Sequence, residues 1–380
     1  MGKYLIVLCI LLSQIASAQK TYKTESKRAI KFYEEGLKSY RLSFYSAAEN
    51  MLMAAIEVDK DFQDAYLVLA EVFWEQSNYK LAINNYNQGL SIDPAYYPRG
   101  YLNKGKLEIK IARYEDARHS FKKFLEIDTI ESKYTFRAIR GIQQSEFALH
   151  AMNNPVDFEP VNLGPNVNTR DDEYWPSLSA DGQTLVITRL VHVYDITQED
   201  RVQEDFFFSN YGKDGWELME NAGSPLNTSD NEGAQSISAN GQLMVYTVCN
   251  RKGVIGRCDI YYSIKKGYEW TFPKNMGQPV NTIAKETQPS LSADGRTVYF
   301  ASNRPGGNGG LDIWVSTQDA EGKWQKPVNL GDSINSPGDE MSPFIHHDNN
   351  TLYFSSDYHI GMGGFDLFVS SQYSQHLING

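Results

Sequence analysis

One block of sequence, ETQPSLSADGRTVYFASNRPGGNGGLDIWVS at 286–316, recurs three more times in the C-terminal half of the chain. Each copy opens with an acid and carries an aspartate in front of its last apolar run. The acids are Glu173, Glu232, Glu286 and Glu340, and the aspartates are Asp205, Asp259, Asp312 and Asp366. Neighbouring acids are 59, 54 and 54 residues apart, and neighbouring aspartates 54, 53 and 54. A fixed period of this length, made of strand-like pieces, predicts the blades of a β-propeller.

Each unit contains the pieces of four strands. In the third unit, PSLS and TVYFAS flank Ala-Asp-Gly at 293–295, a tight turn in which glycine supplies a positive φ. LDIWVS is a third strand, and KWQKPVNLG supplies a fourth. A tryptophan recurs before the fourth strand, at Trp216, Trp270 and Trp324, and is expected to pack between blades. Four antiparallel strands make one blade.

The in-phase recurrence of S-A-D-G-x-T, N-R-x-G and D-I-[WY] between Val156 and Ser371 resembles the PD40, or WD40-like, repeat of TolB-type periplasmic propellers. The whole chain resembles the OmpA-family envelope proteins of Bacteroidota that join helical repeats to such a propeller. The resemblance implies a propeller over residues 153–380 and a place in the cell envelope. In that family a regulatory-like β domain and an OmpA-like peptidoglycan-binding domain usually follow, and this chain is expected to lack both.

The segment FEPVNLG at 158–164 matches a fourth strand but has no three strands before it. It could complete the last blade and close a ring of four blades, by pairing Pro160–Leu163 with the strand at 365–370. We expect the other outcome, an incomplete propeller that forms an open arc, because the pattern is lost after Tyr373. The first unit is five residues longer than the others, so 190–204 is expected to project as a loop.

A second period, of 34 or 35 residues, runs through the N-terminal half. Small residues at Gly36, Ala70 and Gly105 are followed twelve positions later by alanine, and four positions after that by a large apolar residue. This is the pattern of tetratricopeptide repeats, which are pairs of antiparallel helices with small residues where the helices cross. It predicts an α-solenoid of three repeats over residues 19–152. A further helix at about 132–152 should cap the stack with a polar outer face.

Stacked helix pairs form a concave groove, and such grooves commonly hold peptides or partner segments. The candidates for this groove lie on the first helix of a pair, and they are Glu71, Trp74, Asn103 and Lys104. The chain is therefore predicted to be a multidomain protein, part α and part all-β, with an α-solenoid before a β-propeller of four visible blades.

Residues 1–18 have the features of a secretory signal. A lysine at position 3 precedes an apolar run, and Ala16-Ser17-Ala18 is a small-x-small cleavage site. The apolar run is too short to span a bilayer, and Cys9 is a poor lipidation site because Leu8 precedes it. We expect a mature chain that starts at Gln19, has no transmembrane segment, and lies in the periplasm or on the periplasmic side of the outer membrane.

Export allows disulfides, and Cys249 and Cys258 flank the mouth of one predicted hairpin. A disulfide between them is the favoured interpretation, and two free thiols are the alternative. The opening acids of the four units share one face of the propeller. They could ring a central channel and hold a cation, but a structural role is favoured, in which each acid pairs with a basic residue such as Arg251 or Arg304.

The net charge of −11 is uneven: residues 19–152 carry 20 basic and 18 acidic residues, and 153–380 carry 15 and 29. An acidic propeller is a poor nucleic-acid binder. The sequence has no metalloprotease helix, no nucleophile elbow and no cofactor-binding pattern, so no catalytic, cofactor or metal site is predicted. Two function classes remain. The first is a non-enzymatic envelope scaffold that binds proteins or peptides, and the second is a binder of carbohydrate or peptidoglycan fragments.

Overall fold

The computed structural model of the chain describes residues 22–194 and 200–371. Contacts between residues divide it into two compact units that meet at Pro155 and Val156. The first unit is helical and the second is built of β-strands, in the order that the two sequence periods predict. Tetratricopeptide-type helical repeats therefore precede a four-blade, propeller-like β region.

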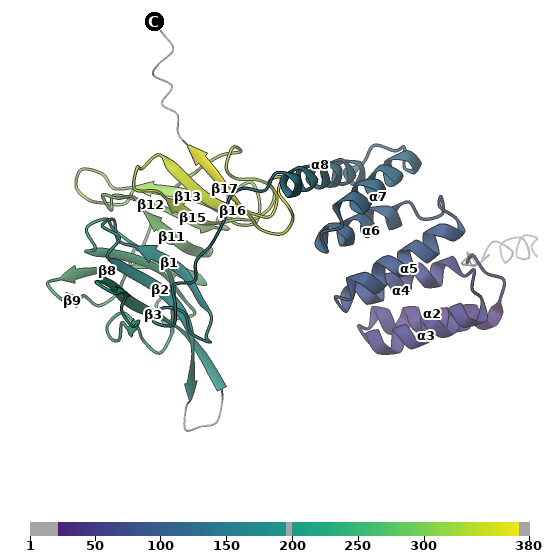
Figure 1. Ribbon diagram of the computed structural model, residues 1–380, viewed down its shortest axis with the longest axis horizontal. Coiled ribbons are helices and arrows are strands. Elements are labelled where there is room, and N and C mark those ends of the chain that lie inside the picture. The colour runs from purple at the N-terminus through teal and green to yellow at the C-terminus, as the bar shows by residue number, and fades with distance from the viewer. Residues whose placement is uncertain (1–21, 195–199, 372–380) are drawn as a thin grey trace, which may run out of the picture. The chain divides into compact units, whose positions relative to one another are not determined.

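The helical unit is a stack of antiparallel helix pairs with one helix left over (Figure 1). Within the described residues it has seven helices, which are α2 (Lys27–Arg41), α3 (Tyr45–Val58), α4 (Gln63–Glu75), α5 (Tyr79–Ile92), α6 (Arg99–Lys110), α7 (Tyr114–Ile127) and α8 (Lys133–Asn153). The pairs are α2 with α3, α4 with α5, and α6 with α7. The three predicted repeats and the additional helix are all present.

The small residues of the repeat stand where helices cross closely. A Cβ atom added to Gly105 on α6 would lie 2.7 Å from the ring of Phe121 on α7. A Cβ on Gly141 of α8 would overlap the other edge of the same ring. Phe121 is 1% exposed, so this ring fills the space between α6 and α8 and joins the third repeat to the last helix.

Helix α8 does not have the polar outer face that was predicted. It buries Ala138, Gly141, Ser145 and Ala148, but Phe136, Ile139 and Phe147 are 64%, 42% and 44% exposed. The reason is its place in the repeat: Gly141 occupies the position of Gly105, so α8 is the first helix of a fourth pair. Within the described residues no second helix follows to cover the exposed side chains.

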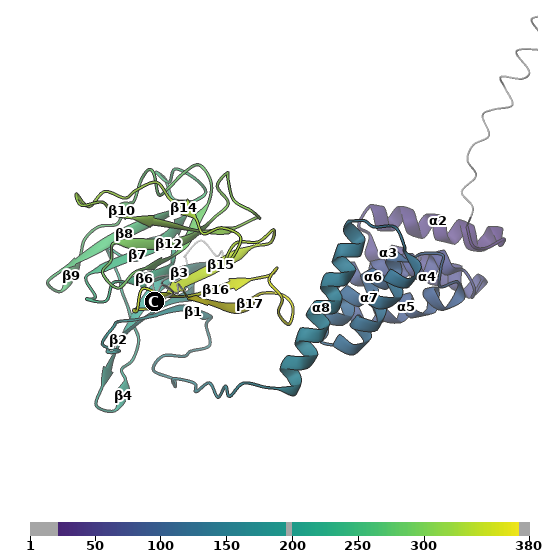
Figure 2. The same cartoon turned by 90° about the horizontal axis from the view of Figure 1, so that it is seen from above.

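The β unit consists of four antiparallel sheets arranged blade by blade (Figure 2). Its strands are β1 (Glu173–Leu178), β2 (Thr184–Tyr194), β3 (Asp200–Gly212), β4 (Gly215–Trp216), β5 (Glu220–Asn221), β6 (Asn231–Ile237), β7 (Leu243–Cys249), β8 (Cys258–Lys266), β9 (Glu269–Trp270), β10 (Lys274–Asn275), β11 (Glu286–Leu291), β12 (Thr297–Ser302), β13 (Asp312–Thr317), β14 (Val328–Asn329), β15 (Glu340–Ile345), β16 (Thr351–Ser356) and β17 (Asp366–Ser371). The inner strands β1, β6, β11 and β15 pack side by side in this order.

The predicted tryptophans lie between strands three and four, and the contacts of Trp270 are those expected of packing between blades. Its ring lies 6.3 Å from that of Phe208 in the preceding blade. The stretch at 190–204, predicted to be a loop, is largely an extension of the hairpin between β2 and β3, with only 195–199 outside the described residues. Its alternating side chains allow it to continue the ladder instead of leaving it.

The fourth sheet lacks a fourth strand. Among the described residues β17 pairs with β16 alone, and residues 158–164 form no strand. Leu367 on β17 is 84% exposed, whereas its counterparts Phe206, Ile260 and Ile313 are fully buried. Val161 is also 84% exposed. The structure thus has the open-arc arrangement, in which Pro160–Leu163 does not pair with β17.

Candidate functional site

The recurring acids Glu173, Glu232, Glu286 and Glu340 are held inside their blades. Each carboxylate accepts hydrogen bonds from the backbone N–H and the side-chain hydroxyl of a residue four positions earlier. For Glu286 the donor is Thr282, whose N and Oγ1 lie 2.7 and 2.8 Å from the carboxylate oxygens. The same bonds join Thr169 to Glu173, Thr228 to Glu232 and Ser336 to Glu340. The acids therefore tie the entry loop of each blade to its inner strand.

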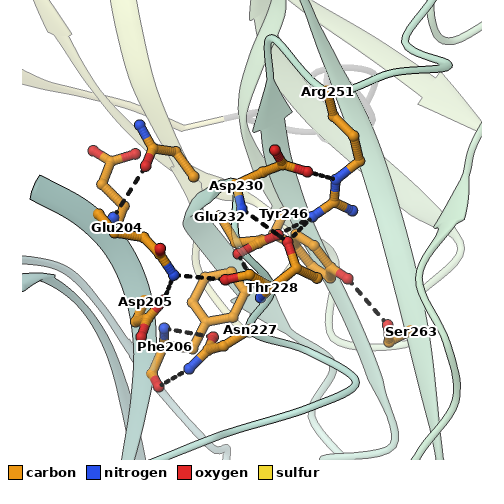
Figure 3. Close-up of polar contacts among 12 residues, drawn as sticks. Glu204, Asp205, Phe206, Asn227, Thr228, Asp230, Glu232, Tyr246, Arg251 and Ser263 are labelled. Carbon is orange, nitrogen blue, oxygen red and sulfur yellow. Dashed lines mark hydrogen bonds and ion pairs between the residues drawn. The ribbon is translucent and has the colours of Figure 1, made fainter. Parts of the chain in front are cut away.

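In three blades an arginine from just after the second strand, or from its end, neutralises the acid. Arg304 lies 3.0 Å from Glu286 and also donates to the carbonyl of Val280, at 2.6 Å. Burial lowers the pKa of the Arg304 guanidinium, and the charge of Glu286 partly offsets this. The equivalent pairs are Arg189 with Glu173 at 3.1 Å and Arg251 with Glu232. Figure 3 shows Arg251 between Asp230 and Glu232.

The fourth blade solves the same problem without an arginine. Glu340 is fully buried and takes part in no ion pair among the described residues. It accepts from the N–H of Ser336 at 2.7 Å and from the hydroxyl of Ser356 at 2.6 Å. The ring of His359 lies 2.8 Å from the carbonyl of Ile334, the counterpart of Val280, and so takes over the other contact of the arginine.

These contacts place the acids in the interpretation that was favoured from the sequence, with Arg251 and Arg304 as partners. They do not gather around a common ion: over residues 22–194 and 200–371 no three His, Cys, Asp or Glu side chains come together in a way that could hold a metal. The chemistry available to these carboxylates is that of a buried structural hydrogen-bond network.

A second network, of asparagines, joins each blade to the next and was not foreseen. The N–H of Phe206 donates to Asn227 at 2.8 Å, and the amide of Asn227 donates back to the carbonyl of Phe206 at 2.9 Å (Figure 3). The Asn227 amide also reaches Asn221, which bonds Asp205. The same contacts recur for Asn275 with Asn281 and for Asn329 with Asn335. A pair of asparagines six positions apart in every unit is the sequence signal that could have revealed it.

In the helical unit, Glu71 is the centre of a polar face built from α4, α5 and α6. The Asn103 amide donates to its carboxylate at 3.0 Å, and the hydroxyl of Tyr86 donates to the same oxygen. Burial, then the charge of Glu71, raises the pKa of Tyr86. The same two causes raise the pKa of Tyr40 to about 12 and that of Tyr97 as well. Glu71 and Asn103, predicted separately, thus belong to one cluster.

The other two predicted groove residues lie elsewhere. Lys104 bonds Asn87 on α5 at 2.7 Å and lies 3.7 Å from Glu108, so it faces the helix packing. Trp74 is half-buried against the main hydrophobic core. Helical spacing alone gave no means to tell these directions apart, because Lys104 follows Asn103 directly and points about a quarter-turn away.

Cations collect beside this polar face. The guanidinium of Arg99 donates to the hydroxyl of Tyr134 at 3.1 Å, and Arg99 and Arg137 lie 5.3 and 5.8 Å from the centre of its ring. Burial and the charge of Arg137 lower the pKa of Lys106, while Glu71 acts in the opposite direction. The first helices thus present an acidic centre on α4 and a basic region on α6 and α8. Arginines in the first turns of α6 and α8 were the available signal.

The two cysteines are joined across the mouth of the second-blade hairpin. The sulfurs of Cys249 and Cys258 are 2.08 Å apart and the Cα atoms 4.1 Å apart. The two residues face each other in register at the ends of β7 and β8. None of the helices in the described part of the chain is long and apolar enough to cross a membrane.

The tetratricopeptide repeat family matches the chain over residues 63–96 and 98–130, which are the second and third helix pairs. No curated protein sequence matches the chain.

Solved structures similar to this chain are themselves tetratricopeptide domains. The first such domain of human RPAP3 is 17% identical, covers 34% of this chain and 98% of its own, and has a TM-score of 0.30. The Arabidopsis OM64 domain gives 20%, 30%, 94% and 0.29. The Yersinia enterocolitica secretion chaperone SycD, solved with a peptide of the translocator YopD, gives 17%, 32%, 95% and 0.30. With TM-scores near 0.3, nothing about binding is inferred from these similarities.

Proposed function

We propose that this protein is a non-enzymatic scaffold of the cell envelope that holds a protein or peptide partner against the inner face of its helical repeats. The observation that carries the proposal is the polar cluster of Glu71, Tyr86 and Asn103 on the first helices of two repeats that match the tetratricopeptide family. Repeats of this type act as protein-interaction modules, and stacking them produces an extended concave surface.

Charge gives this face a direction. Glu71 and Glu75 on α4 stand at one end, and Arg99, Lys106 and Arg137 stand at the other. A partner segment lying along the face would meet acidic groups first and basic groups second. Complementary charge of this kind sets the orientation of a bound segment more than its affinity.

The test is to capture partners with the full-length protein from envelope extracts, using a variant that reverses the basic end, Arg99→Glu with Arg137→Glu. The matched control is Lys80→Glu with Lys122→Glu, because these exposed lysines lie on the second helices α5 and α7 and the charge change is the same. A specific partner should be lost by the first variant and kept by the control. Equal recovery by both variants would place the contact elsewhere and contradict the groove.

The envelope part of the proposal rests on the signal-like residues 1–18, which lie outside the described residues. It predicts a mature protein beginning at Gln19 and carrying no lipid, which intact-mass measurement of the exported protein can check. A diacylglyceryl group on Cys9 would contradict it. The non-enzymatic part would fail if the purified protein had a hydrolase activity that disappeared on replacing one histidine or aspartate.

A further inference from the structure

The four inner strands share an irregularity at the same place. In each of them the pairing with the second strand shifts register, and one residue there has a positive φ: 54° at Trp175, 53° at Ala234, 55° at Gln288 and 53° at Ser342. A bulge of this kind turns backbone and side chains out of the ladder. Here all four bulges turn toward one cavity at the centre of the β unit.

This axial cavity has an empty volume of about 540 Å³. Three consecutive residues of every inner strand line it: 175–177, 234–236, 288–290 and 342–344. A second cavity of about 520 Å³ shares Trp175, Ala234 and Gln288 with the first and adds Glu204 and Lys285. Because the two share a wall, they form one cleft that runs from the axis past the indole of Trp175. Its size is that of a small-molecule site.

The cleft has an aromatic side and a polar side, which the repeat alone does not require. Trp175 stands where the other blades have alanine, glutamine and serine, and Phe344 stands where they have Ser177, Ser236 and Ser290. Both aromatic residues belong to the first and last blades. Opposite them the lining is made of glutamines, serines and threonines from the second and third blades.

Several polar groups of the cleft are not used by the fold. Gln288 accepts from the N–H of Ser342 with its carbonyl oxygen, at 2.8 Å, but its amide nitrogen donates to no group within the described residues. Glu204 accepts from the hydroxyl of Tyr174 with one oxygen, at 2.6 Å, which leaves the other available. The ammonium of Lys285 forms no ion pair in the part of the chain that the structure describes. Donors and acceptors therefore converge on a cavity with an aromatic wall.

We propose that this axial cleft binds a saccharide, with the apolar face of a sugar ring on Trp175 and Phe344 and its hydroxyl groups bonded to Gln288, Glu204 and Lys285. Sugar rings present C–H groups on their faces and hydroxyls at their edges, which is the distribution this cleft complements. An anionic polymer fits poorly, because residues 153–380 carry 29 acidic and 15 basic residues. The inference concerns the β unit alone and stands independently of partner binding by the helices.

The experiment is isothermal titration of the full-length protein with two neutral probes, the trimer of N-acetylglucosamine and cellotriose. Saturable binding of at least one trimer is expected. Trp175→Ala and Glu204→Gln should each weaken it by about tenfold, the loss expected when one stacking or hydrogen-bonding contact is removed. Tyr268→Ala is the matched aromatic control, because this tyrosine is 100% exposed at the tip of a hairpin and should change nothing.

Trp175→Phe and Lys285→Gln serve if the alanine variant fails to fold, since both keep most of the side chain. The phenylalanine variant should retain part of the affinity and the glutamine variant should lose about tenfold. Absence of heat with both trimers at millimolar concentration would overturn the proposal. So would unchanged affinity in the Trp175 and Glu204 variants, or saturable binding of a proline-rich peptide in place of either sugar.

Discussion

Replacing Arg304 by methionine should unfold the propeller far more easily than replacing Arg304 and Glu286 together. The guanidinium and the carboxylate lie 3.0 Å apart, with side chains 8% and 0% exposed. Methionine keeps most of the length of the arginine but leaves the carboxylate without its cation. An unpaired buried charge costs roughly 3–5 kcal/mol.

A second term adds to this cost. The carbonyl of Val280 accepts from Arg304 at 2.6 Å and would lose that donor, a loss of about 1–3 kcal/mol for a buried group. The two losses overlap, because the structure relaxes once, so a total of about 4–6 kcal/mol is expected for Arg304→Met. The double variant Glu286→Gln with Arg304→Met removes the buried charge, and Gln can still bond Thr282. It should recover at least half of the loss.

Urea unfolding followed by tryptophan fluorescence measures this, because five of the six tryptophans lie beyond residue 155. Helical ellipticity provides an internal control, since α2–α8 pack in clusters of their own and should unfold at an unchanged urea concentration. The naturally arginine-free fourth blade gives the comparison: Glu340→Gln should cost less than Arg304→Met, because no cation is stranded there.

The reasoning would be refuted if Arg304→Met lowered the free energy of unfolding by less than about 1 kcal/mol, the value of an exposed ion pair. A double variant less stable than the single one would refute it too, since that would mean the carboxylate stabilises the blade without its arginine.

Three further outcomes are expected. Burial raises the pKa of Glu108, against the opposing effects of Lys104 and Ser120, so the folded protein holds this proton to higher pH and stability falls as the pH rises above the ordinary pKa of 4.5; Glu108→Gln should therefore raise the melting temperature of the helical unit more at pH 7 than at pH 4, and an equal gain at both would contradict the shift. Non-reducing peptide mapping should link Cys249 to Cys258, and reduction should cost about 2–3 kcal/mol; complete alkylation of both thiols in exported protein would disprove the disulfide. Cysteines placed at Val161 and Val369, which are 84% and 60% exposed, should stay unlinked on oxidation, whereas an intrachain link would show that the ring closes in solution.

The β unit was predictable because its signals are repeated in phase. One Asp-Gly turn is weak on its own, but four of them at a constant spacing, each between β-branched strands, leave few other folds. The partner of each opening acid could be named in part for the same reason: Arg251 and Arg304 stand at equivalent positions. The hydroxyl four residues before the acid was missed, although Thr282 and Ser336 occupy that position, because threonine and serine are common in turns.

The helical groove was predictable only to the level of which helices line it. Period and small residues show which side of a helix packs, and Gly105 was placed correctly against its neighbour. Whether an adjacent polar residue faces the groove or the next helix depends on contacts with α5. Glu108, 1% exposed and bonded to Ser120 at 2.6 Å, illustrates the limit: no sequence pattern indicates that a glutamate is buried there.

The axial cleft could not be read from the chain at all. Its walls come from four segments about 55 residues apart, and each contributes only three residues. Trp175 lies in the sequence as one more aromatic residue of a strand, and only the meeting of the four bulges gives it neighbours from every blade.

The asparagine pairs mean that the unit of inheritance and the unit of assembly are out of step. Asn221 and Asn227 follow the third strand of the first blade and lead into the second, so a cut after a third strand separates a blade from the amides that hold it. A duplication or deletion of 54 residues keeps every joint intact only if its ends fall at the Asp-Gly turns between the first two strands. Shortened or extended versions of this protein should be designed with boundaries there, and chimaeras joined at that turn should inherit complete joints from both parents.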